Sequence, residues 1–205
     1  MQADQVAGYD AMRARGPIAY DGDRSWTVFG HAEAVRILDD PATFSNAVSR
    51  HLQIPNGLDG ERHRAYRAVV DRYFTAERLA AFEPACRAVA AELAAALPRG
   101  RAVEVMSVLA EPFADNVTCA FMGWPDALRA PLRAWAEKNR RATRAGDRTA
   151  LSTIAVEFDG HIRAQLDARR GEPFTDPTGE LLHETVDGRP LRDEEIVSIV
   201  RNWTV

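Results

Sequence analysis

The sequence predicts a mainly α-helical protein with a small β-sheet near its N-terminus. Through most of the 205 residues, apolar side chains recur with helical spacing, most clearly in the stretch 59–74. Two strand-like runs, 18–20 and 26–29, flank an Asp-Gly-Asp turn that is typical of a hairpin. Two long arginine-rich helical stretches, about 126–144 and 149–170, follow one another across a glycine-containing break.

Local start and stop signals define the helices nearest the N-terminus. Gln5–Arg15 is a helical stretch that ends at Gly16-Pro17. His31–Leu38 is a compact amphipathic helix that stops before Pro41. Residues 46–58, which contain a Pro-Asn-Gly sequence, are expected to form a loop.

The stretch 59–74 is expected to be one amphipathic helix with Asp59 as its N-cap. At about 100° per residue, His63 falls in the middle of the apolar face, and Arg67 lies one turn further along, at its edge. We therefore expect both side chains to point inward, where a buried arginine needs an anion. The alternatives are a surface pair between Arg67 and Asp71 and a hydrogen-bonded core histidine.

The remaining elements follow from caps, prolines and glycines. The expected elements are helix 76–82 capped by Thr75, helix 84–97 starting at Pro84, strand 102–106, helix 112–122 closed by Gly123, a short helix starting at Asp176-Pro177, a turn at Asp187-Gly188, and a last helix capped by Asp193 with Leu191 as its staple. The apolar stripe of that last helix consists of Ile196, Ile199, Val200 and Trp203.

Composition excludes several classes of protein. The net charge of −4 is unlike that of a general nucleic-acid binder. No signal peptide and no membrane-spanning run is visible, so a cytoplasmic location is expected, with Cys86 and Cys119 as reduced core thiols. The five histidines show no metal-ligand spacing, and no nucleophile or phosphate-binding motif is present.

The motif His63-Arg-Ala-Tyr-Arg67 resembles the H-x-x-x-R of helix C in bacterial cytochromes P-450. The order of the flanking motifs agrees: Asp40-Pro-Ala-Thr-Phe-Ser45 resembles the family's D-P-x-x-F-S, and Tyr73-Phe-Thr75 resembles its F-T close. The sequence Leu191-Arg-Asp-Glu-Glu-Ile-Val197 resembles the start of helix I. Gly60-Glu-Arg62 departs from the family's P-P-E, so the stiff proline entry to the helix is lost.

The resemblance implies a partial cytochrome P-450 fold, from helix A to the start of helix I. Residues 1–205 would then be a single incomplete domain, the N-terminal half, in which the second half with the haem cysteine ligand is absent. The cofactor would be haem b, with His63 and Arg67 holding a propionate and with no catalytic residue or metal ligand in this segment. Cys86 and Cys119 lie in helical patterns and not in the turn that a thiolate ligand needs.

The resemblance also implies two binding surfaces. The loop 46–58 would lie over the distal haem face, with Leu52 and Ile54 contacting a small-molecule substrate; a plain connector is the alternative. Arg64 and Arg72 would face a ferredoxin-like electron donor, unless they form only a solvated helix face. The arginines around the break near residue 146 would lie on the helix F–G lid, where a solvated cationic face is expected and a ligand contact is the alternative; they are Arg140, Arg141, Arg144 and Arg148.

The resemblance therefore implies the N-terminal part of a haem-thiolate monooxygenase, which inserts one oxygen atom from O2 into a small organic substrate. These residues alone are expected to be inactive, and the apolar stripe of the last helix is expected to lack neighbours. The alternatives are a non-catalytic α-helical binding or scaffold protein and a degenerate fragment of the same fold.

Overall fold

A computed structural model of the chain describes residues 4–20, 22, 25–49, 51–171, 173 and 175–204. The helices are α1 (Gln5–Arg15), α2 (His31–Leu38), α3 (Gly60–Asp71), α4 (Ala76–Ala95), α5 (Glu111–Met122), α6 (Arg129–Ala145), α7 (Arg148–Asp167), α8 (Pro177–Leu181) and α9 (Asp193–Thr204), with short helical turns at Arg72–Phe74, Met106–Ala110 and Asp126–Leu128. The strands are β1 (Ile18–Tyr20), β2 (Trp26–Val28), β3 (Thr185–Val186) and β4 (Arg189–Pro190). The fold is mainly α, as predicted.

The strands form two antiparallel hairpins, β1 with β2 and β3 with β4. Ile18 pairs with Val28 in the first, which confirms the predicted N-terminal sheet. Asp21 and Asp23 of its turn, and the C-terminal Val205, lie outside the described residues. The β3–β4 turn uses the predicted Asp187 and Gly188, both with positive φ.

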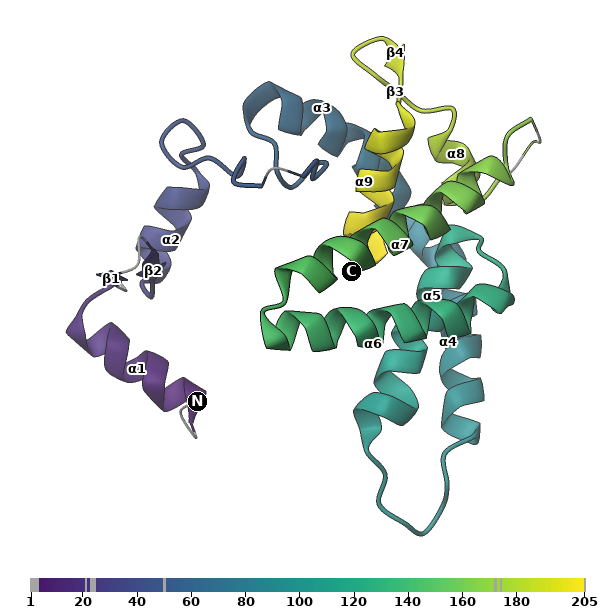
Figure 1. Cartoon of the computed structure of the whole chain (residues 1–205), viewed down its shortest axis with the longest axis horizontal. Coiled ribbons are helices and arrows are strands. Elements are labelled where there is room, and N and C mark those ends of the chain that lie inside the picture. Colours follow the sequence, from purple (N-terminus) through teal and green to yellow (C-terminus); the bar gives the residue numbers. More distant parts are fainter. Residues whose placement is uncertain are drawn as a thin grey trace.

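The helices α3 to α9 form one body, while α1, the β1–β2 sheet and α2 stand to one side of it (Figure 1). Within the body, α9 packs against α7, and α6 runs alongside α7. No residue of α2 is buried, although its sequence is amphipathic. No helix in the described part of the chain is long and apolar enough to cross a bilayer.

The stripe of α9 lies at the centre of the core, contrary to our expectation that it would lack neighbours. Ile196, Ile199 and Val200 are at most 1% exposed. They belong to the same buried cluster as Phe158 and Ile162 of α7. The prediction was wrong because α7, a helix of this same chain, covers the stripe.

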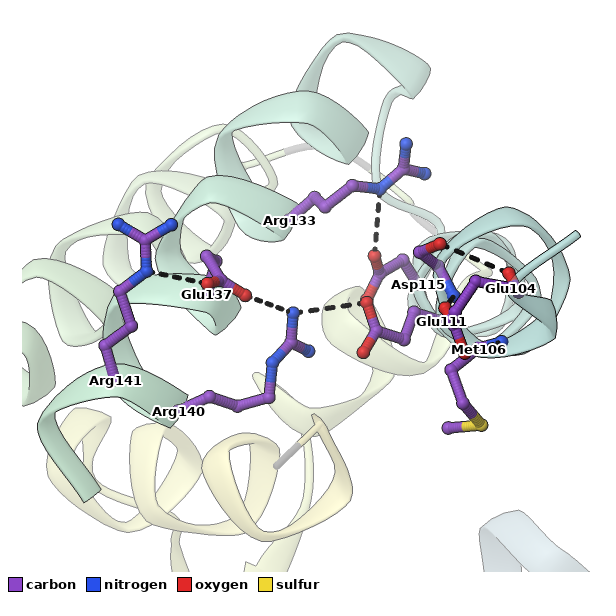
Figure 2. A network of polar contacts seen from close by, with 9 residues as sticks. Glu104, Met106, Glu111, Asp115, Arg133, Glu137, Arg140 and Arg141 are labelled. Atoms are coloured by element: carbon purple, nitrogen blue, oxygen red, sulfur yellow. Dashed lines mark hydrogen bonds and ion pairs between the residues drawn. The ribbon is translucent and has the colours of Figure 1, made fainter. Parts of the chain in front are cut away.

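Two predictions of secondary structure, a helix break at Pro84 and a strand at 102–106, were wrong for local reasons. Helix α4 continues through Pro84, because this proline and Ala80 lie on an exposed side where water can bind the carbonyl that loses its partner. The predicted strand 102–106 is absent, because the Glu104 carboxylate accepts hydrogen bonds from the backbone N–H groups of Met106 (3.1 Å) and Ser107 (2.7 Å) and so starts a helix there (Figure 2).

The N-terminus of α9 also differs from the prediction. Asp193 is already inside the helix, and its carboxylate accepts from Arg170 (2.6 Å) instead of capping. The Glu195 carboxylate reaches back to the backbone N–H of Arg192 (2.8 Å), in the manner of the acidic residue of a capping box. A buried glutamate therefore holds the first turn of this helix.

Candidate functional site

Helix α3 presents His63 and Arg67 at the surface of the body. Tyr66, Val69 and Val70 of the same helix are buried, at 3% exposure each. Arg67 Nε lies 2.8 Å from Asp71 Oδ1, and the two side chains are 51% and 55% exposed. His63 is half-buried. The predicted inward orientation of Arg67 is wrong, because Asp71, one turn further on, offers a partner that leaves the guanidinium in contact with water.

Asp59 stands at the N-cap position of α3, but its side chain makes no cap hydrogen bond. Its carboxylate accepts from Ser45 Oγ (2.5 Å) and from the backbone N–H of Asn46 (3.0 Å). These two hydrogen bonds lower the pKa of Asp59. The residue therefore ties the segment after α2 to the start of α3.

A buried carboxylate lies behind α3, and sequence reasoning missed it. Glu195 is 1% exposed, and its carboxylate accepts from the hydroxyl of Tyr66 (2.6 Å) and from both terminal nitrogens of Arg189 (2.8 and 2.9 Å). The Arg189 hydrogen bonds, together with others to the same oxygens, lower the pKa of Glu195 well below its usual range. The sequence signal was a glutamate at the third position of a helix, which is common in solvated caps.

The loop before α3 is attached to α9 by hydrogen bonds to its backbone. The backbone N–H of Ile54 donates to Ser198 Oγ (2.8 Å), which in turn donates to the carbonyl of Leu52 (2.9 Å). Asn202 Nδ2 donates to the carbonyl of Ile54 (2.7 Å). Ile54 is 1% exposed and lies in the core, so its side chain anchors the loop and is not open to a small molecule; Leu52 is 37% exposed. The prediction of a substrate contact is therefore corrected for Ile54.

A pocket of about 440 Å³ lies between this loop, α7 and α9. His51 and Gln53 line it from the loop, and Leu151, Ala155 and Val156 give it an apolar wall along α7, with further lining by Arg148, Ser152, Asp159 and Arg201. Arg201 of α9 pairs with Asp159 of α7 through two hydrogen bonds, of 3.1 and 2.9 Å. The pocket therefore combines one apolar wall with charged ends.

Two of the arginines near the end of α6 are paired with carboxylates (Figure 2). Arg140 bonds Glu137 (2.7 Å) and Glu111 (3.1 Å), and Arg141 bonds Glu137 (2.7 Å). These exposed pairs contribute little to stability, about 0–1 kcal/mol each. Arg148, in contrast, lines the pocket beside α7.

The two arginines expected to meet an electron donor differ from one another. Arg72 pairs with Glu184, a carboxylate that is only 17% exposed, so its positive charge is largely compensated. Arg64 is exposed on α3. Within the described residues Arg64 forms no ion pair, so of these two arginines only Arg64 presents an uncompensated positive charge.

Both cysteines lie within helices. Cys119 of α5 is fully buried, and burial raises the pKa of its thiol. Cys86 of α4 is half-buried, and both are free thiols. The described residues contain no group of three His, Cys, Asp or Glu side chains that could hold a metal ion.

This helical arrangement is similar to that of known structures. No protein-family model matches the chain. The open cytochrome P450 Eryk from S. erythraea superposes with a TM-score of 0.86 at 26% identity, over 98% of this chain and 55% of that one. The chain is therefore similar, over nearly its whole length, to about half of that cytochrome P450 structure.

Curated bacterial sequences are also similar to the chain. The chain is 29% identical over 192 residues to cyclomarin C epoxidase CymV of Salinispora arenicola, which covers 85% of this chain and 48% of that protein. It is 28% identical over 208 residues to erythromycin C-12 hydroxylase of Saccharopolyspora erythraea, covering 94% and 52%. The chain therefore spans about half the length of the curated relatives it matches.

Proposed function

We propose that the chain is the N-terminal part of a haem-thiolate monooxygenase that inserts one oxygen atom from O2 into a small organic molecule. The observation that carries the proposal is the likeness over nearly the whole chain to cytochromes P450 that include a hydroxylase and an epoxidase. This likeness comes with a pocket of about 440 Å³, a volume suited to a small molecule.

The exposed face of α3 fits the carboxylates of a haem. His63 and Arg67 are spaced one turn apart, and an imidazole N–H and a guanidinium are suitable donors to a carboxylate. The current partner of Arg67 is Asp71, and such an i,i+4 pair contributes only about 0.2–0.5 kcal/mol. A haem carboxylate can therefore replace Asp71 at little cost. The haem, once bound with a thiolate ligand from outside this segment, supplies the oxygen chemistry.

The pocket beside α7 is the proposed place of the substrate. The apolar wall formed by Leu151, Ala155 and Val156 would contact its hydrocarbon part, and the accessible Leu52 lies in the same loop as the lining residue His51. Arg148 offers a charge that Asp159 does not compensate, because Asp159 is already paired with Arg201. Because Leu52 is accessible and lies next to His51 in the chain, we retain it as a proposed substrate contact.

Arg67→Ala is expected to weaken haem binding by the complete protein by about tenfold or more, since a hydrogen bond to a charged group contributes about 1.5–3 kcal/mol. The measurement is haem affinity by titration of the apoprotein. Arg62→Ala, an exposed arginine on the first turn of the same helix, is the matched control and should leave the affinity unchanged. Equal affinities for the wild type and Arg67→Ala would remove the carboxylate role.

Arg64→Glu is expected to slow reduction of the complete protein by an acidic ferredoxin-like donor at low salt, because charge steering raises the association rate. The difference from wild type should shrink as salt is raised. Arg99→Glu, on the exposed loop between α4 and α5, changes the net charge equally and is the control. Identical slowing by both variants would mean that only overall charge matters and not the α3 surface.

A further inference from the structure

The Glu195 carboxylate accepts hydrogen bonds from two arginines, although one positive charge would balance its negative charge. Arg189 donates twice, and Arg192 donates from its backbone N–H (2.8 Å) and from Nη2 (3.0 Å). These arginines are 45% and 61% exposed, so they cover the solvent side of the carboxylate. Their two positive charges already exceed the one negative charge.

The fifth donor, Tyr66, comes from the protein interior and from a distant part of the chain. Its hydroxyl donates to Glu195 Oε1 (2.6 Å) and accepts from Arg189 Nη2 (3.2 Å). The tyrosine is 3% exposed and stands 129 positions before Glu195. It adds no charge to the cluster, so its distinctive effect is to connect α3 to the start of α9.

The hydrogen bond from Tyr66 to Glu195 gives the middle of α3 a contact of defined direction with another helix. Among the described residues, the other polar contacts of this helix are the Arg67–Asp71 pair within it and contacts at its two ends, made by Asp59 and Arg72. Val69 and Val70 pack through apolar contacts, which are non-directional. Tyr66 lies between His63 and Arg67, so it sets the rotation of the helix where those two side chains emerge.

We propose that Glu195, held by Arg189, positions α3 through the Tyr66 hydroxyl so that His63 and Arg67 are oriented toward the carboxylates of the haem. Tyr66 and Glu195 are then positioning residues that act without touching the cofactor. The inference rests on the proposed function, because it needs a haem at the exposed face of α3.

The test compares haem with haem dimethyl ester, which lacks the two negative charges, as ligands of the complete apoprotein. Tyr66→Phe removes only the hydroxyl. It is expected to weaken the binding of haem by about three- to tenfold and to leave the binding of the ester unchanged. A loss of general stability would instead weaken both ligands equally.

Tyr73→Phe is the matched control. Tyr73 is also fully buried, and its hydroxyl also donates to a glutamate, Glu184 (3.2 Å), but it lies beyond the end of α3. The ratio of haem to ester affinity should therefore stay at the wild-type value in Tyr73→Phe.

The outcomes separate the two proposals. If Arg67→Ala lowers the ratio of haem to ester affinity and Tyr66→Phe does not, the positioning role is overturned while the proposed function stands. An equal fall for both ligands in Tyr66→Phe also overturns it. If the wild type binds haem and ester equally and Arg67→Ala changes neither, the carboxylate site itself fails.

Discussion

Gly123→Ala is expected to destabilise the chain by about 3 kcal/mol or more. Gly123 ends α5 with φ of 69°, in the left-handed region, and an added Cβ would overlap the side chain of Asp176. Asp176 cannot move freely, because it caps α8 by accepting from the N–H of Gly179 (2.9 Å) and pairs with Arg169 (2.9 Å). Arg169 is 5% exposed, so displacing Asp176 removes the ion-pair partner of a buried positive charge.

Gly146→Ala is the control for this prediction. Gly146 ends α6 with φ of 64°, nearly the same backbone conformation, but nothing lies within 4 Å of an added Cβ. Its substitution should cost only the backbone term, roughly 1–2 kcal/mol. Urea unfolding of both variants measures the difference. Equal losses of stability would show that the contact with Asp176 contributes nothing beyond the left-handed backbone.

The 205-residue chain, mixed with haem and a reductant, is expected to show no thiolate-type Soret band in its carbon-monoxide difference spectrum. Such a band requires an axial thiolate. Cys119 is fully buried in α5, and burial raises the pKa of its thiol, so the thiolate form is disfavoured. Cys86 lies within the helix α4 and not in a turn open to a cofactor.

The cysteine variants make this test specific. Cys86→Ser and Cys119→Ser should give the same spectrum as the unmodified chain. A thiolate-type band that disappears in one of them would identify that cysteine as a ligand and contradict the assignment of the thiolate to residues outside this segment.

Most secondary structure was predictable because its signals are local. The bounds of α1 and α2 agree with prediction to the residue, since a cap, a glycine or a proline lies at their ends. The strand predicted at 102–106 failed because a glutamate side chain competed with the alternating pattern. In both cases the deciding atoms lie within a few positions in the chain.

The sequence by itself determined most of the helices, the N-terminal hairpin, and the placement of His63 and Arg67 one turn apart on α3, because these depend on spacing and on neighbouring residues. The order of the motifs around them also resembles that of bacterial cytochromes P450. Only the tertiary structure decided that Arg67 faces solvent, that Ile54 anchors its loop in the core, and that Glu195 joins α9 to α3. The contacts of Ile54 and Glu195 join residues more than a hundred positions apart, so they have no local signal in the sequence. The spacing of Arg67 and Asp71 is visible in the sequence, but only the structure decides between that surface pair and an inward orientation.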